Sequence, residues 1–350
     1  MTIPRYKWQP TTLEIAAAAG IDPADVIRFD HNTTPWPTGW AVELVSEAAA
    51  TLNEYPGASY LGIREAAAGR HGLEPEQIMP GAGADELILL AARAFLRPGQ
   101  RSAMLTPTYP LYRIACAQVG AQITEVAAEP PSFEFPIDAM LAAARDAEVV
   151  WLCVPNNPTG VDIVPEVVEA VIAATDGVVV VDAAYAEFTG ADWAEPVERH
   201  SNLIVLRTLS KAFALAGARV GYAMAHPSLV DRLDAVRPPG SISSISVELA
   251  RLVLGRPELA ARAVKELEAA RRRLAVGLAA VGFRVLPSAA NFLLCEVGPT
   301  AMDLAASLRG RGMVVRTFGA ETALEEYLRF TVRSPEQNEQ LLGALGEVLL

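Results

Sequence analysis

The sequence predicts an α/β protein: a three-layer large domain with a mainly parallel sheet, followed by a smaller α+β domain. The middle of the chain alternates short apolar runs rich in β-branched residues with stretches rich in Ala and Leu. Because these apolar runs are nearly continuous, their strands are expected to be buried on both faces, as in parallel sheets covered by helices. The pattern changes after Pro238-Pro239-Gly240, where short strands mix with helices. We therefore expect an N-terminal arm over residues 1–38, a large domain over 39–240 and a small C-terminal domain over 241–350.

Four runs of apolar and β-branched residues are expected as strands of the large domain. They are RSAMLTP (101–107), EVVWLCV (148–154), GVVVVD (177–182) and NLIVLRT (202–208). Two stretches have the composition of helices, DELILLAARAFL (85–96) and PEVVEAVIAATD (165–176). In the small domain we expect one long helix over 247–281, because its Arg and Lys residues recur at the spacing of a solvated face. Short strands are expected there at 283–287, 291–297, 313–318 and 327–332.

The composition argues against several classes of function. The formal net charge of −12 disfavours a general binder of nucleic acids or membrane surfaces. No apolar run approaches the ~20 residues that cross a bilayer, and the polar start predicts no secretory signal, so we expect a cytoplasmic protein. Cys116, Cys153 and Cys295 are expected to be buried thiols. The histidines lack the spacing of metal ligands, so no metal site is expected.

Polar residues follow three consecutive expected strands, at the edge where ligands bind in open α/β sheets. Asn157 follows the first strand, in a PNNPTG segment that is also typical of a plain tight turn. Asp182 ends the second strand, where a carboxylate needs a partner such as a protonated pyridine nitrogen, unless it caps a helix. Lys211 lies in an apolar loop after the third strand, where loss of water lowers the pKa of an amine and suits it to Schiff-base chemistry. Together the three residues predict a pyridoxal-phosphate site.

More polar residues are expected around this site. Tyr185 would project from the same turn as the aspartate, and Ser210 and Arg219 flank the lysine at spacings compatible with a shared phosphate. A Gly-rich turn runs into a helix at Ala84-Asp85, whose N-terminal N–H groups favour an anion, although an ordinary helix start has the same pattern. Tyr109 lies just after a strand and is either a contact of the ligand or a half-buried aromatic residue.

Two arginines lie in short apolar strands of the small domain. An unpaired guanidinium at Arg316 or Arg329 would be costly there, and its planar fork suits a carboxylate or a phosphate. The alternative is an internal ion pair with one of the many acidic residues. Both arginines are therefore candidates for binding an anionic substrate.

The order of these segments along the chain resembles that of the fold-type I pyridoxal-phosphate (PLP)-dependent aminotransferases of class I/II. Among these, the sequence is most similar to the histidinol-phosphate aminotransferase family. The resemblance runs over nearly the whole chain, through LNEYPG, GAGADEL, TPTYPLY, PNNPTG, VDAAYAEF, RTLSKAFALAGARVGY, PSAANFLL, VVRTF and YLRFTV. It implies the fold-type I architecture, PLP as the cofactor and amino transfer as the reaction.

Carried to the matching positions, the resemblance implies a role for each residue of the cofactor site. Lys211 would hold the cofactor covalently and then move the proton, and Asp182 would pair with the pyridinium nitrogen. Asn157 and Tyr185 would bind the phenolic oxygen, and Tyr109 would stack on the ring. The phosphate would be held by Ser210, Arg219, the backbone of Ala84-Asp85, and Tyr55 from a neighbouring subunit. The last contact implies a homodimer with shared active sites.

The sequence departs from the family around the substrate and at two positions near the cofactor. The resemblance implies that Arg329 binds the substrate carboxylate and that Arg316 adds a second positive charge for a phosphate. Asn32 begins an NTTP stretch where the family has N-E-N-P, and RPPGSISSI lacks the usual Tyr-Asn; both regions lie near the substrate in the family. The cofactor region also differs, with Ala183 in place of Glu and Ala82 in place of Asn.

We therefore expect a PLP-dependent aminotransferase that takes the amino group of L-histidinol phosphate to 2-oxoglutarate. The small-molecule alternatives are an aminotransferase for aromatic or specialised-metabolite amino acids and a decarboxylase of a phosphorylated amino acid. A non-catalytic PLP-binding protein is the alternative from another class.

Overall fold

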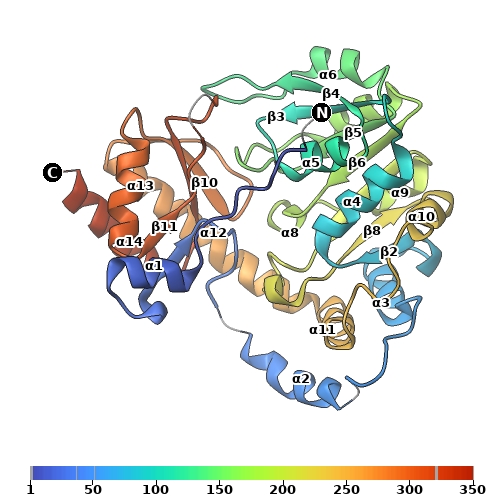
Figure 1. Cartoon of the computed structure of the whole chain (residues 1–350), viewed down its shortest axis with the longest axis horizontal. Coiled ribbons are helices and arrows are strands. Elements are labelled where there is room, and N and C mark those ends of the chain that lie inside the picture. The colour runs from blue at the N-terminus through green and yellow to red at the C-terminus, as the bar shows by residue number, and fades with distance from the viewer. Residues whose placement is uncertain (1–2, 37, 51, 320–321, 350) are drawn as a thin grey trace.

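A computed structural model describes residues 3–36, 38–50, 52–319 and 322–349. Its largest element is a seven-stranded sheet in the order β2-β8-β7-β6-β5-β3-β4 (Figure 1). The strands in that order are Ile78–Gly81, Gly221–Ala225, Leu203–Thr208, Val178–Asp182, Val149–Cys153, Arg101–Thr106 and Gln122–Ala127. β8 runs antiparallel to the other six strands of this sheet, which share one direction. The expected mainly parallel sheet is confirmed, and its four expected strands are β3, β5, β6 and β7.

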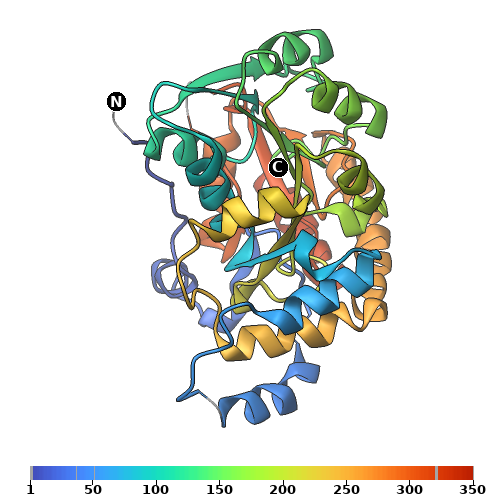
Figure 2. The same ribbon diagram turned by 90° about the vertical axis from the view of Figure 1, so that its right-hand side faces the viewer.

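Helices cover both faces of this sheet, as the buried strand pattern predicted (Figure 2). Alternate residues of β6 show why: Val178 and Val180 belong to one apolar cluster, whereas Val179 and Val181 belong to the other. The first cluster includes side chains of α4 (Gly83–Phe95), α5 (Leu111–Gln118) and α10 (Pro227–Asp234). The second includes side chains of α3 (Leu61–His71), α6 (Ile137–Ala144), α7 (Pro165–Ala173), α8 (Ala186–Thr189) and α9 (Ala194–Arg199).

The C-terminal part contains a small antiparallel sheet in the order β12-β10-β9. Its strands are Tyr327–Thr331, Phe292–Glu296 and Arg284–Val285, and the helices α13 (Ala301–Gly310) and α14 (Pro335–Val348) accompany them. The single long helix expected over 247–281 is wrong. The chain forms α11 (Ser244–Leu254) and α12 (Pro257–Ala280), because Pro257 cannot continue a helix but fits at the first position of a new one.

Residues of the N-terminal segment contact the C-terminal part of the chain. They form α1 (Thr12–Ala19) and β1 (Ile27–Phe29), and β1 pairs in parallel with β11 (Met313–Val315). Figure 1 accordingly shows α1 beside the C-terminal helices. The helix α2 (Val42–Ala49) and four short 3-10 helices complete the structure, the latter at Pro23–Asp25, Gly39–Ala41, Pro75–Gln77 and Ala216–Ala218. The domain boundaries at 38 and 240 stay predictions.

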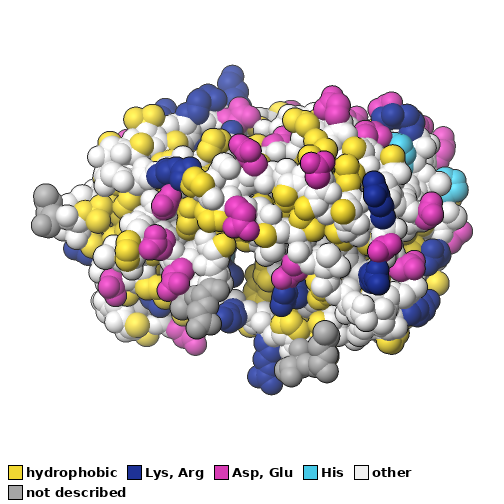
Figure 3. Space-filling view, turned by 90° about the horizontal axis from the view of Figure 1, so that it is seen from above, with side chains coloured by type: hydrophobic (Ala, Val, Ile, Leu, Met, Phe, Trp, Pro, Cys, Tyr) yellow, Lys and Arg dark blue, Asp and Glu magenta, His cyan; other side chains and the backbone are white. Residues whose placement is uncertain are grey.

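Cys116, Cys153 and Cys295 are free and buried, as expected. In the described ranges, no helix is long and apolar enough to span a membrane, and no group of three or more His, Cys, Asp or Glu residues could hold a metal ion. Figure 3 shows acidic and basic side chains intermixed over one face of the molecule.

Candidate active site

The three residues predicted at strand ends come together at one edge of the large sheet. β5 and β6 pair in parallel with Cys153 opposite Asp182, and β6 pairs with β7. Asn157 follows β5 and Lys211 follows β7 within a few residues, so both lie beyond the same carboxyl edge. This is the edge where open α/β sheets bind ligands.

Asp182 is buried, and two hydrogen bonds hold its carboxylate. Tyr112 Oη donates to Oδ2 at 2.6 Å, and the N–H of Ala184 donates to Oδ1 at 3.2 Å. Asp182 does not cap a helix, because the following helix begins at Ala186. Burial raises the pKa of Asp182 to about 6, even though both hydrogen bonds act to lower it. Because Asp182 caps no helix, the alternative that its carboxylate serves only as a helix cap is wrong.

Lys211 presents a half-buried amine. Its Nζ donates to the carbonyl oxygen of His31 at 3.4 Å and lies 5.9 Å from the centre of the Tyr185 ring. Burial lowers the pKa of Lys211 to about 8, and the nearby charge of Arg329 acts in the same direction. At physiological pH, Lys211 is therefore neutral more often than a solvated lysine is. The neutral amine is the nucleophile in Schiff-base chemistry.

Tyr185 is held by a hydrogen-bond chain from the N-terminal segment. Asn32 Nδ2 donates to Tyr185 Oη at 2.9 Å, and Thr331 Oγ1 donates to Asn32 Oδ1 at 3.0 Å. Asn32 has a left-handed backbone conformation, with a φ of 53°, which asparagine tolerates better than most residues. Burial raises the pKa of Tyr185 well above its usual value, so the phenol stays protonated. Because Asn32 donates to the oxygen, the Tyr185 hydroxyl proton is available to another acceptor.

Arg329 is a buried cation at the same site. Its Nη1 donates to Asn157 Oδ1, its Nη2 donates to the Asp30 carbonyl oxygen at 2.7 Å, and its Nε has no partner in the described structure. The guanidinium lies 5.1 Å from the centre of the Phe292 ring. Burial lowers the pKa of Arg329 to about 10, so it remains charged at neutral pH. No carboxylate pairs with it among the described residues, which argues against the alternative of an internal ion pair.

The helix α4 begins beside this group. The N-cap residue Ala82 has no side chain that could cap the helix, and Glu86 Oε2 accepts from the N–H of Ala82 rather than from one in the first turn, so the N–H groups of the first turn, including that of Ala84, can bind an anion. Tyr109 Oη donates to Asp85 Oδ1 at 2.9 Å, so Tyr109 is hydrogen-bonded at the start of this helix. Gly83 has a φ of 80°, and a Cβ there would lie 2.8 Å from Nη2 of Arg219, so the turn requires glycine.

Arg219 joins the start of α4 to the loop that carries the lysine. Its Nη2 pairs with Asp85 Oδ2 at 2.9 Å, and its Nη1 donates to Ser210 Oγ at 3.4 Å. Ser210 is buried and accepts a second hydrogen bond from Thr208 Oγ1 at 3.0 Å. A guanidinium, a hydroxyl and helix N–H groups are thus neighbours, which is a donor set suited to a phosphate.

In the described structure, two predicted residues, Tyr55 and Arg316, are not hydrogen-bonded through their side chains to the residues of this cluster. Tyr55 is 92% exposed, and no hydrogen bond links it to the residues described above. Arg316 lies just after β11, where its backbone pairs with that of Arg329. Its half-buried side chain has no hydrogen-bond or ion-pair partner in the described part of the chain. The structure therefore leaves the Arg316 guanidinium available to a ligand.

The structure adds residues that the sequence did not single out. Tyr112 holds the aspartate and stacks on Trp151, with the ring centres 5.3 Å apart. The carbonyl groups of Asp30 and His31 accept hydrogen bonds from the buried arginine and the lysine. Tyr112 lies in the first turn of α5, three residues after the predicted Tyr109, and that spacing was its only signal in the sequence.

Comparison with known proteins identifies the family. Residues 25–345 match the family model described as aminotransferase class I and II. The chain belongs to this family. It is 35% identical over 344 residues to histidinol-phosphate aminotransferase 1 of Thiobacillus denitrificans, covering 96% of this chain and 88% of that one. It is 36% identical over 343 residues to the histidinol-phosphate aminotransferase of Chromobacterium violaceum, covering 95% and 93% of the two chains.

A solved structure gives the same result for the fold. The histidinol-phosphate aminotransferase of Sinorhizobium meliloti, in complex with pyridoxal-5′-phosphate, superposes with a TM-score of 0.89 at 25% identity. The match covers 98% of this chain and 95% of that one. The protein is thus a PLP-dependent aminotransferase of the fold-type I architecture, as the sequence predicted.

The residues of this aminotransferase fit the cofactor. Asp182 is a buried carboxylate that forms no ion pair with a Lys or Arg side chain among the described residues, and a protonated ring nitrogen would supply the missing cation. The Lys211 amine has a lowered pKa at the same sheet edge. The start of α4, Ser210 and Arg219 supply phosphate donors on the same side.

Proposed function

We propose that this aminotransferase transfers the amino group of L-histidinol phosphate to 2-oxoglutarate, producing imidazole acetol phosphate and L-glutamate. The observation that carries the proposal is the backbone bridge that places Arg316 opposite Arg329, whose charge is close enough to Lys211 to lower the pKa of that amine. Arg329 is buried with an unpartnered Nε, and Arg316 has a half-buried side chain without a described partner. Two such cations suit a substrate pair in which one member carries carboxylates and the other a phosphate.

We assign the chemistry of the site to three residues. The Lys211 amine would hold the cofactor and then move a proton between the two carbons that exchange it. The Asp182 carboxylate would keep the ring nitrogen protonated, and the bound cofactor supplies an electron sink. The Tyr185 hydroxyl would donate to the phenolic oxygen of the ring, since Asn32 already donates to Tyr185 Oη. Asn157 would bind the same oxygen.

The phosphate and the ring would be held by residues around the first turn of α4. We propose that the N–H groups of Ala84-Asp85, the Ser210 hydroxyl and the Arg219 guanidinium bind the phosphate. Tyr109, hydrogen-bonded to Asp85, would lie against the ring. The exposed Tyr55 would complete the phosphate site of a second copy, so the proposed assembly is a homodimer. We also propose that the protein is cytoplasmic.

Substrate recognition would involve the two arginines and the N-terminal NTTP segment. Arg329 would bind the carboxylate of glutamate, Arg316 would bind the phosphate, and Asn32 would lie next to the substrate. Thr33, where the family has Glu, is hydrogen-bonded to another arginine. Arg333 Nη1 donates to the carbonyl and hydroxyl oxygens of Thr33 at 3.2 and 3.3 Å. Asn32 is thus the residue of this segment that reaches the tyrosine of the site.

The experiment compares kcat/KM for L-histidinol phosphate and for phosphate-free L-histidinol in the natural protein and in Arg316→Met. A hydrogen bond to a charged group contributes about 1.5–3 kcal/mol, so the preference for the phosphorylated substrate is expected to fall about 10- to 100-fold. Arg311→Met is the matched control, because Arg311 pairs with Glu347 on the outside of the C-terminal part. An unchanged preference in Arg316→Met would contradict the assignment of this residue. Turnover of aromatic amino acids but not of L-histidinol phosphate would contradict the proposed substrate.

A further inference from the structure

A buried ion pair outside the active site lines a cavity of about 910 Å³. Arg207 lies on β7 and is 3% exposed, and its Nη2 contacts Oε1 of Glu187 at 2.5 Å. Residues of α3, of the region around α8, of the end of α11 and of the N-terminal half of α12 form the rest of the lining. This cavity lies on the face of the sheet covered by α3, and its lining shares no residue with the site described above.

The ion pair leaves several buried polar atoms without a partner. Arg207 Nε and Nη1, Glu187 Oε2 and Arg70 Nη1 have no hydrogen-bond partner within the described structure. Leaving buried groups of this kind unpaired is costly, so a polar ligand in the cavity would be stabilising. Two guanidiniums and one carboxylate give this inner part of the cavity an excess of one positive charge.

Histidine does not add to that charge. His71 Nε2 lies 2.8 Å from Tyr222 Oη, and its Nδ1 lies 3.4 Å from Asp192 Oδ1. Burial lowers the pKa of His71 to about 4, and the charge of Arg207 acts in the same direction, so His71 is neutral at physiological pH. The positive end of the cavity is therefore made by the two arginines.

The outer lining has the opposite sign. The acidic side chains of Glu65, Asp192 and Glu268 line the cavity together with a single exposed lysine, Lys265. Glu65 and Asp192 are exposed, and Glu268 is half-buried. The cavity is thus positive at its buried end and negative at its mouth. A ligand that carries both an anionic and a cationic group would match both ends.

We propose that this cavity is a second binding site, and that its ligand is a zwitterionic α-amino acid. The carboxylate would accept hydrogen bonds from Arg207 and Arg70, whose planar forks suit it. The ammonium would lie toward Glu65 and Glu268. The unpartnered Glu187 Oε2 would accept a hydrogen bond from the ligand or from a water molecule that bridges to it.

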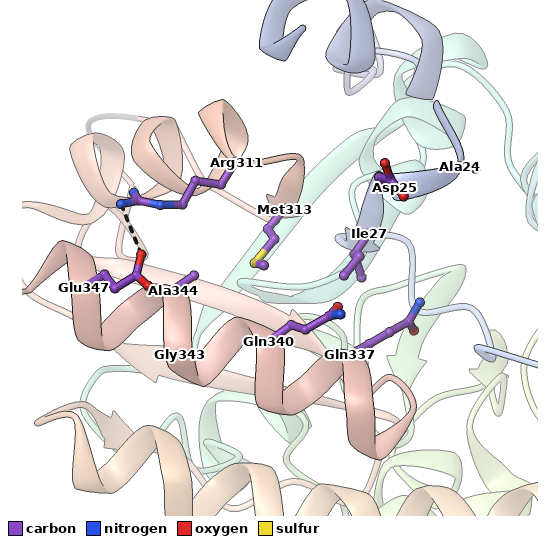
Figure 4. Close-up of a pocket in the computed structure, with 10 residues that line it drawn as sticks. All are labelled: Ala24, Asp25, Ile27, Arg311, Met313, Gln337, Gln340, Gly343, Ala344 and Glu347. Carbon is purple, nitrogen blue, oxygen red and sulfur yellow. Dashed lines mark ion pairs between the residues drawn. The ribbon is translucent and has the colours of Figure 1, made fainter. Parts of the chain in front are cut away.

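A second groove in the molecule lacks these features. It lies between α14, β1 and β11, and its ion pair, Arg311 with Glu347 at 3.6 Å, is at the surface (Figure 4). None of the unpartnered buried atoms in the described chain belongs to its lining. Of these two pockets, only the Arg207 cavity offers a charged ligand unpartnered buried groups from the described residues.

The test is calorimetric titration of the PLP-loaded protein after borohydride reduction, which fixes the cofactor and blocks amino acids from reacting at the active site. Glycine and L-glutamate are the probes, and acetate and methylamine represent their two halves. We expect saturable binding of one glycine or glutamate per chain, tighter than the binding of either half. This binding should persist in Arg329→Met, which removes the carboxylate site proposed at the active site. No saturable binding, or acetate binding as tightly as glycine, would overturn the proposal.

Variants at the two ends of the cavity test the direction of the ligand. Arg70→Met keeps the aliphatic stem and is expected to weaken amino-acid binding at least about 10-fold, the effect of losing one charge-assisted hydrogen bond. Glu65→Gln, at an exposed position, is expected to weaken amino-acid binding while leaving acetate binding unchanged. Arg262→Met is the control, because Arg262 lies on α12, is 84% exposed and pairs only with Glu266 among the described residues. Equal affinity in Arg70→Met and Arg262→Met would overturn the assignment.

Discussion

Asp182→Asn is expected to stabilise the cofactor-free protein while it impairs catalysis. The carboxyl pKa of about 6 in the folded protein lies two units above its ordinary 3.8, because burial disfavours the charged form. Two pKa units correspond to about 3 kcal/mol, which is the cost of keeping this carboxylate ionised in the folded protein at neutral pH. Asparagine has nearly the same shape and does not bear this cost.

The gain is partly offset by weaker hydrogen bonds. Tyr112 Oη now donates to a charged oxygen at 2.6 Å, and in the variant it would donate to a neutral amide oxygen. Hydrogen bonds to charged groups exceed neutral ones by about 1 kcal/mol, so the expected net gain at pH 7.5 is about 1–3 kcal/mol. The sign follows from the raised pKa: the natural protein is stabilised by this group at acid pH and loses that stability as the pH rises through about 6.

The assay is urea unfolding of both cofactor-free proteins at pH 7.5 and at pH 4.5. The Asn variant is expected to be more stable at pH 7.5, with the difference shrinking at pH 4.5, where the natural carboxyl is largely protonated. Asp146→Asn, at an exposed surface position, is the control and should show no such gap. With PLP bound, turnover of Asp182→Asn is expected to fall about 100-fold or more, as for loss of a preorganised electrostatic partner. A variant less stable than the natural protein at pH 7.5 would refute the reasoning.

Three further changes test other parts of the site. Lys211→Ala is expected to retain no more than a trace of turnover. In the natural cofactor-free protein, attachment of PLP, followed by visible absorbance, should speed up as the pH rises through about 8, because the Lys211 amine loses its proton there. Tyr112→Phe removes a hydrogen bond to a carboxylate and should raise the pKa of Asp182 by about one to two units, seen as an upward shift in the pH dependence of unfolding; an unchanged profile would contradict this. Gly83→Ala places a Cβ in a backbone conformation with a φ of 80° and against a phosphate-site guanidinium, so PLP affinity should fall at least about 10-fold in a protein that remains folded. The matching change Gly72→Ala, at a φ of 69° and with no described atom within 4 Å of the added Cβ beyond its chain neighbours, should leave PLP affinity unchanged.

The sequence predicted the central strands because burial on both faces leaves a continuous apolar run, as in β6. It missed three strands of the same sheet for physical reasons. β2 has only four residues and ends in Pro80-Gly81, and β8 reads GYAMA without a β-branched residue. β4 is a sheet edge with several exposed positions, so its pattern is not continuous. Pairing with neighbours determines these strands more than their own composition does.

In the candidate site, too, residues next to a recognisable strand could be predicted, whereas contacts between distant parts of the sequence could not. Asn157, Asp182 and Lys211 could be found because each follows a recognisable strand. The partners of these residues could not be found in this way, because they are distant in the sequence. Arg329 bonds to Asn157 across 172 positions, and Asn32 bonds to Tyr185 across 153. Such contacts depend on how the N- and C-terminal segments pack on the large sheet.

One measurement tests the central claim most directly. The purified yellow protein is mixed with L-histidinol phosphate, and the loss of the visible absorbance of the lysine-bound cofactor is followed, with L-glutamate and L-phenylalanine in parallel. We expect rapid conversion to the pyridoxamine form with L-histidinol phosphate and with glutamate, far faster than with phenylalanine. Conversion by glutamate or phenylalanine but not by L-histidinol phosphate would contradict the proposed substrate, and no conversion by any of the three would contradict the proposed site.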